Sequence, residues 1–181
     1  MRVRTVLLVI FALGAAGAAL ATPPLRASSG KPAPALPGDF GLLYATLDRG
    51  DLLESRELFA PAAAFAAIGR GAPLPAGTVL TMIVYSVKRD TAGRPLRDGQ
   101  GRFVKDAVAA VLVMRKLAES ARPPLGPAQG PWQFQLFGAD GLPDRAARMS
   151  DCALCHRRAH GPDPVFTAED MKAFAAERRA R

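Results

Sequence analysis

The chain has 181 residues, 49% of them hydrophobic and 22% charged, with a formal net charge of +8 at pH 7. This length corresponds to one domain and is sufficient to bury a core. Only two cysteines are present, so structural disulfides do not support the fold, which excludes the disulfide-rich small secreted domains.

The first 21 residues have the three parts of a secretory signal peptide. Arg2 and Arg4 form a positive start, residues 6–20 are apolar, and Ala19-Leu20-Ala21 matches an A-x-A cleavage site. The sequence therefore predicts export across a bacterial inner membrane to the periplasm, with residues 1–21 removed.

A membrane anchor is the alternative interpretation of this N-terminus. The apolar run is shorter than the ~20 residues that a membrane-spanning helix needs, and prolines follow it, so we expect no stable membrane span after cleavage. Residues 22–38 are rich in Pro and Ala and are predicted to be a flexible segment. Residues 39–181 then form the predicted folded domain.

Four segments have the β-branched and aromatic composition of strands. Turn residues fill the stretch 89–101, which predicts an antiparallel hairpin with a long tip between the second and third of these segments. The fourth alternates aromatic and polar residues, which predicts one buried face. The segments are residues 53–59, 78–88, 102–114 and 132–137.

Helices are predicted around these strands. Pro61 and Gly69 flank a helix over residues 62–68, because proline favours the start of a helix and glycine its end. A C-terminal helix is expected to run to about Arg179, with Thr167 and Asp170 as a capping box at its start. The pattern predicts an α+β fold in which an antiparallel sheet precedes the last helices.

The segment Cys152-Ala153-Leu154-Cys155-His156 contains both cysteines and carries the chemistry. C-x-x-C-H attaches c-type haem: two thiols form thioether bonds to the vinyl groups, and the histidine becomes the proximal iron ligand. A thioredoxin-like pair is the first alternative, but it requires a βαβ pattern that is missing here. A zinc site that also uses His160 would crowd its ligands, and a disulfide is the third alternative.

Three blocks of residues together resemble the cytochrome P460 family, which includes cytochrome c′-beta. The first is similar to the family's strand entry P-D-G-T-V, the second to G-x-W-x-F, and the third to C-x-x-C-H followed by D-x-V-F-T. In this chain they are Pro75-Ala76-Gly77-Thr78-Val79-Leu80, Gly130-Pro131-Trp132-Gln133-Phe134, and residues 152–156 followed by Asp163-Pro164-Val165-Phe166-Thr167.

The resemblance implies a mostly antiparallel sheet that covers one face of a single haem c, which is attached through Cys152 and Cys155. It implies that His156 is the metal ligand and that the distal side is open to a small ligand such as NO, CO or hydroxylamine. A homodimer and a redox partner protein are further implied partners. Nucleic acid is not expected as a partner of an exported haem protein.

Met82 departs from the family pattern. Cytochrome P460 proper has a lysine on the strand after its first block, covalently linked to the porphyrin, and counting from Gly77 places Met82 there; the nearest lysine on the strand is Lys88. The resemblance therefore favours a c′-beta-like protein that binds small ligands. A P460-type enzyme that oxidises hydroxylamine or NO, and an electron carrier with His156 and Met82 as axial ligands, stay open as alternatives.

Several other residues have two interpretations each. Met82 either packs on the porphyrin edge or ligates iron. Tyr85 donates a hydrogen bond to a bound ligand or to the backbone. Asp163 caps the loop after the motif or contacts His156. The aromatic residues of 132–137 are expected in the core, and the arginines around the motif serve solubility or form a positive rim for an acidic partner.

Overall fold

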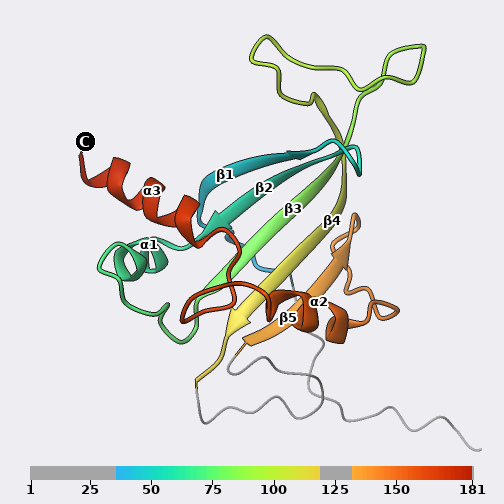
Figure 1. Ribbon diagram of the computed structural model, residues 1–181. Helices are drawn as coiled ribbons and strands as arrows, with labels where there is room; N and C mark the ends of the chain where they lie inside the picture. Colours follow the sequence, from blue (N-terminus) through green and yellow to red (C-terminus); the bar gives the residue numbers. More distant parts are fainter. Residues whose placement is uncertain (1–35, 119–131, 181) are drawn as a thin grey trace, which may run out of the picture. The chain divides into compact units, whose positions relative to one another are not determined.

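Five antiparallel strands in sequence order form the centre of the fold (Figure 1). The computed structural model describes residues 36–118 and 132–180. Each strand pairs with the next along the chain, so the sheet is a simple meander with no crossover. The strands are β1 (Leu42–Arg49), β2 (Glu54–Ala60), β3 (Val79–Val87), β4 (Lys105–Lys116) and β5 (Trp132–Gly138).

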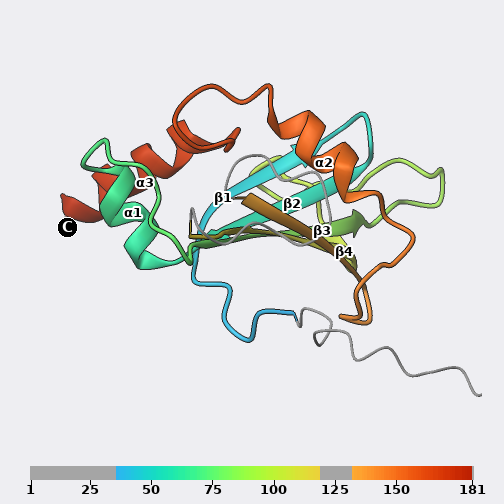
Figure 2. The ribbon, with the colours of Figure 1, turned by 90° about the horizontal axis from the view of Figure 1, so that it is seen from below.

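Three helices pack on one face of this sheet (Figure 2). They are α1 (Ala62–Ile68), α2 (Met149–His156) and α3 (Ala168–Arg179). Their buried side chains share a core with Leu80 of β3, Met114 of β4, and Trp132 and Phe134 of β5. This arrangement confirms the predicted α+β fold with its C-terminal helix.

The opposite face of the sheet has its own apolar cluster. Ile83, Val111, Val113 and Phe137 form it, because they occupy the alternate positions of β3, β4 and β5. Phe40, which precedes β1, packs there against Phe59 with ring centroids 5.8 Å apart. The aromatic residues of β5 are therefore divided between the two faces.

The predicted elements differ from the structure in two places. Strand β1 was not expected at all. The predicted capping box of α3 is wrong: Thr167 makes no side-chain bond to the helix start, and its hydroxyl lies 2.7 Å from the hydroxyl of Tyr44 on β1. Burial raises the pKa of Tyr44 to about 12, and this polar contact ties α3 to the edge of the sheet.

The predicted long tip between β3 and β4 is an ordered arm, residues 88–104, that extends beyond the end of the sheet (Figure 1). The arm contains two copies of the same six-residue turn, and the second copy begins eight residues after the first. In each copy an Asp carboxylate accepts the backbone N–H groups two and four residues later, and a glycine follows at positive φ. The copies are Arg89-Asp90-Thr91-Ala92-Gly93-Arg94 and Arg97-Asp98-Gly99-Gln100-Gly101-Arg102.

Three backbone hydrogen bonds close the base of the arm in a ring. Lys88 N–H donates to Val104, Val104 N–H to Leu96, and Leu96 N–H to Lys88, at 2.8–3.0 Å. Asp48 of β1 then fixes the base to the sheet, because it accepts from Phe103 N–H at 2.9 Å and from Arg102 Nε at 3.1 Å. Arg102 also donates to the Thr46 carbonyl at 2.8 Å, so the arm is held by its own turns and by two acceptors on β1.

The predicted signal peptide and most of the predicted flexible segment lie outside the described residues. Within residues 36–118 and 132–180, no helix combines the length and apolar character that crossing a membrane requires.

Candidate functional site: a cysteine-bearing helix against the sheet

Helix α2 presents one face to the sheet and carries the C-x-x-C-H motif on it. Met149, Cys152, Ala153 and His156 are spaced i, i+3, i+4 and i+7, so they share this face. Ala153 is fully buried, and Met149 and Cys152 pack against the core at its edge. Cys155 lies beside this face and is exposed, so both thiols are accessible from one side of the helix.

The His156 ring is held in a fixed orientation by three contacts. Its Nδ1 lies 2.7 Å from the carbonyl oxygen of Pro164. Because a carbonyl only accepts, Nδ1 carries a proton, which leaves Nε2 as the nitrogen that can bind a metal. The rings of Phe134 and Phe166 both pack against it, with centroids 5.0 and 5.1 Å from that of His156. This is the arrangement that prepares a neutral imidazole to bind a metal through Nε2.

A buried carboxylate, Asp163, holds the loop that supplies this carbonyl. It accepts hydrogen bonds from Leu74 N–H at 2.8 Å, from Lys116 Nζ at 2.6 Å and from Trp132 Nε1 at 3.1 Å. The ion pair with Lys116 is largely removed from solvent, since the two side chains are 13% and 8% exposed. Of the two interpretations of Asp163, the structure favours the one in which it holds the loop after the motif; the contact to His156 is made by the next residue, Pro164.

The first family-like block is a turn that delivers Leu74 to Asp163. Thr78 N–H donates to Pro75 at 3.1 Å, and Gly77 between them has φ of +85°, which is the geometry of a type II turn. The backbone N–H of Gly77 in turn donates to the backbone carbonyl of Lys116 on β4. Trp132 of the second block and Asp163 of the third therefore meet at one carboxylate, together with Leu74, the residue just before the first block.

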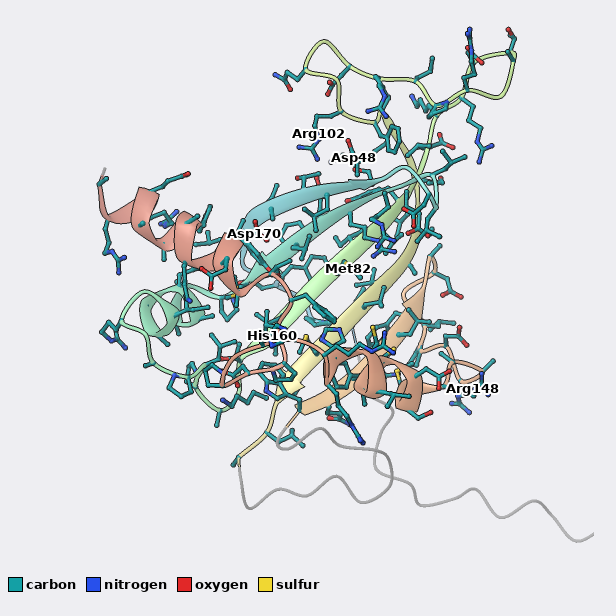
Figure 3. All side chains as sticks on the ribbon, in the orientation of Figure 1. Asp48, Met82, Arg102, Arg148, His160 and Asp170 are labelled. Atoms are coloured by element: carbon teal, nitrogen blue, oxygen red, sulfur yellow. The ribbon has the colours of Figure 1, made fainter. Side chains whose placement is uncertain are left out.

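An apolar row crosses the sheet on the face that α2 covers. Cross-strand pairing places one residue from each strand in it, in the order Ala45, Leu58, Met82, Leu112 and Leu136. Leu58 is buried, whereas the other four are only partly buried. The row lies beside the fully packed row of Leu80, Met114 and Phe134, and Met82 is at its centre (Figure 3). The protein's own side chains therefore leave part of this apolar surface uncovered. The uncovered part lies next to Phe134, which packs against His156.

Arg56 is the charged side chain that borders this row, and sequence reasoning missed it. It lies two residues from Leu58 on the same face of β2, opposite Val84. Its guanidinium binds Glu54 at 2.8 Å, and the side chains of this pair are 21% and 29% exposed. In sequence, a Glu and an Arg two apart on a strand look like an ordinary solvent-facing pair, so no signal identified them.

The geometry argues against the alternatives for the two cysteines. Neither cysteine forms a disulfide, although both belong to the described residues. Among residues 36–118 and 132–180, no three His, Cys, Asp or Glu side chains gather as a metal site would require, and His160 is exposed. Burial, with the nearby charge of Asp151, raises the pKa of the Cys152 thiol, whereas a reactive redox cysteine has a lowered pKa.

Two other candidates lie away from the site. Tyr85 is on the opposite face of the sheet, where its hydroxyl donates to Glu57 at 2.9 Å rather than to a ligand or the backbone. Partial burial and this bond raise the pKa of Tyr85 to about 12. Lys88 is exposed at the base of the arm, beyond the end of β3. Neither residue is placed to reach the face that α2 covers.

The sequence profile of cytochrome P460 matches residues 39–167 of the chain. The chain belongs to the cytochrome P460 family. No curated protein sequence matches it. Membership identifies a haem cytochrome, and the spacing of Cys152 and Cys155 is consistent with haem c.

The residues of the site fit a haem group. Two unpaired thiols and an imidazole with a free Nε2 supply the donors that c-type attachment requires. The partly exposed row around Met82 supplies an apolar face of the kind that a porphyrin covers. The family membership, the donor atoms and the apolar surface are therefore all consistent with a bound haem.

Proposed function

We propose that this protein is an exported, mono-haem c-type cytochrome that binds a small ligand such as NO at an open distal site. Cys152 and Cys155 hold the haem covalently, and His156 Nε2 is its proximal ligand. Bound haem supplies an iron centre that takes diatomic ligands and exchanges one electron. The observation that carries the proposal is that an oriented His156 adjoins an apolar sheet face with methionine at its centre.

The sheet residues shape the side opposite His156. Leu58, Met82 and Leu112 exclude water from this surface, because their side chains offer no hydrogen-bonding group of ordinary strength. Arg56, at the border, adds a donor that can orient a polar ligand atom or a propionate while Glu54 balances its charge. An apolar surface with one donor at its edge suits a small neutral molecule such as NO or CO.

Hydroxylamine oxidation is the less favoured function at this site. Met82 has no amine, so it cannot form the lysine cross-link that distinguishes cytochrome P460 proper. A porphyrin that lacks this bond keeps ordinary haem c chemistry. The missing lysine therefore supports the c′-beta type, whose members lack the cross-link.

Electron transfer with Met82 as sixth ligand is the second candidate. His156 packs on Phe134 of β5, whereas Met82 lies on β3, two strands or about 10 Å away across the sheet and one row further along. This offset favours packing of the Met82 thioether against the porphyrin over ligation. A long-lived sixth ligand would also close the site to NO.

A redox partner is compatible with either function. Arg145, Arg148, Arg157 and Arg158 are exposed around α2 and form a positive rim; Figure 3 shows Arg148 beside this helix. Such a rim attracts an acidic partner to the haem edge at low ionic strength. We further propose a periplasmic location and a homodimer, which the family resemblance implies.

Ligand titration tests the proposal. Protein matured with haem is reduced and mixed with NO or CO, and separately incubated with hydroxylamine and an electron acceptor. We expect rapid spectral changes with both gases and no turnover of hydroxylamine. Turnover of hydroxylamine would overturn the ligand-binding role in favour of the enzyme, and indifference to both gases would favour the electron carrier.

A further inference from the structure

The Asp163–Lys116 ion pair lies one residue along the chain from the group that contacts His156. Pro164, which accepts the Nδ1–H of His156, is the residue next to Asp163. Lys116 approaches from β4 and lies 5.8 Å from the centre of the Trp132 ring. Among the described ion pairs, this one is the most completely removed from solvent. Charges in such surroundings act on their neighbours with little screening.

Both oxygens of the Asp163 carboxylate accept hydrogen bonds from groups other than His156. Oδ2 accepts from Leu74 N–H, and Oδ1 accepts from Lys116 and Trp132. It therefore does not compete with the Pro164 carbonyl for the imidazole. A histidine that donates to a neutral carbonyl is a weaker electron donor through Nε2 than one that donates to a bare carboxylate.

We propose that the Asp163–Lys116 pair positions the proximal ligand and sets its donor strength. Asp163 anchors the loop so that the Pro164 carbonyl meets His156 Nδ1, and Lys116 cancels the carboxylate charge. The inference rests on the proposed ligation of haem iron by His156. Both residues are assigned an action through His156 and through the electric field at the iron.

Single and paired substitutions separate this role from a structural one. Asp163→Asn leaves the Lys116 charge unbalanced, which disfavours ferric iron and raises the reduction potential. Lys116→Gln leaves the Asp163 charge unbalanced and lowers the potential. The double variant Asp163→Asn/Lys116→Gln removes both charges and is expected to return close to the wild-type potential. Lys116→Arg keeps the charge and is expected to change the potential least.

The ion pair between Lys172 and Glu169 on α3 supplies the matched control. Its atoms are 2.7 Å apart, as closely paired as Asp163 and Lys116, but its side chains are 50% and 84% exposed. Lys172→Gln and Glu169→Gln therefore make similar charge changes where water and salt screen them. We expect no shift in potential for either control.

The experiment measures the reduction potential and the iron–histidine stretching band of the ferrous protein for each variant. Opposite shifts for Asp163→Asn and Lys116→Gln, cancelled in the double variant, support the proposal. Shifts in the same direction that add in the double variant would overturn it. Loosening of the loop would shift the reduction potential without regard to the sign of the charge that each substitution removes.

Failure to accumulate haem protein is also informative. If both single variants fail but the double variant holds haem, charge compensation is supported; if the double variant fails as well, the pair is structural and the proposal is wrong. A wild-type ferrous protein without an iron–histidine band would instead contradict ligation by His156. That result would remove the proposed function as well as this inference.

Discussion

The indole N–H of Trp132 donates to the carboxylate of Asp163 across 3.1 Å, joining β5 to the loop that carries Pro164. Both partners are buried, and Trp132 is only 1% exposed. The contact links two sequence blocks that lie about thirty residues apart in the chain. It explains why a tryptophan and an aspartate belong to one family signature: together they fix the acceptor of His156.

Covalent attachment of haem is the first prediction. The double variant Cys152→Ala/Cys155→Ala is expected to lose all haem on denaturing gels, because no other cysteine is present to form a thioether. Haem staining and intact mass of protein matured with the c-type machinery check it. Leu154→Ala is the control, since this residue lies between the cysteines and is 58% exposed. Haem that stays on the double variant through denaturation would refute attachment by the motif.

Met82 gives a second prediction, which separates packing from ligation. If the thioether packs on the porphyrin as proposed and does not bind iron, Met82→Ala is expected to leave the ferrous haem five-coordinate and reactive toward CO. Loss of a half-buried side chain is expected to lower the free energy of unfolding by about 1–2 kcal/mol. Absorption spectra and denaturant unfolding measure the two effects. A change from low-spin to high-spin haem on substitution would show that methionine was the sixth ligand.

The sequence predicted most of the sheet and the motif helix, but it missed β1. That strand contains a register shift between Leu43 and Ala45, so its apolar residues do not alternate in the period-two pattern that identifies a strand. The contact to His156 was one of two interpretations given to Asp163, and its neighbour Pro164 makes that contact. Every residue has a backbone carbonyl, so the residue type at Pro164 gives no signal for this contact. Asp163, next to it, has a side chain that could accept the same hydrogen bond.

The duplicated turns of the arm give a third prediction. Gly101 has φ of +78°, whereas Gly99, two residues away, has no such constraint, and an added Cβ would meet no atom within 4 Å at either position. Gly101→Ala is expected to lower the free energy of unfolding by about 1 kcal/mol, and Gly99→Ala by much less. Denaturant unfolding of both variants checks this. Equal effects would show that the left-handed turn does not constrain the arm.

Asp48 gives a fourth prediction, on acid stability. Partial burial would by itself raise its pKa, but hydrogen bonds from Arg102, Phe103 N–H and Ser55 outweigh burial and hold the pKa below the ordinary value of 3.8. A lowered pKa stabilises the fold above the unfolded value, and this contribution is lost as the pH falls through the folded value. Asp48→Asn is expected to cost about 1–2 kcal/mol at neutral pH, from weakened hydrogen bonds to a charged group.

Unfolding at about pH 7 and about pH 3 measures this contribution. The wild type is expected to lose more free energy of unfolding between these conditions than Asp48→Asn does. Asp51→Asn is the control, because Asp51 is paired with Arg49 at an exposed position where ion pairs contribute little. The same pH dependence in the wild type and in Asp48→Asn would contradict the anchoring role of Asp48.

Other features of the site were beyond what one sequence can predict. The apolar row around Met82 exists only once the register of five strands is known, because its members come from positions 45 to 136. The place of Arg56 beside this row likewise follows only from the strand register. The two turns of the arm repeat an eight-residue pattern that is present in the sequence, but composition alone identifies only a long turn there.

The absorption spectrum of the ferrous protein, before and after addition of CO, tests the central claim most directly. The account predicts five-coordinate, high-spin haem c whose spectrum shifts at once with CO, because His156 binds one side and the Met82 face leaves the other side open. A low-spin ferrous spectrum that CO does not change would contradict it, as would the broad red-shifted band of a cross-linked porphyrin.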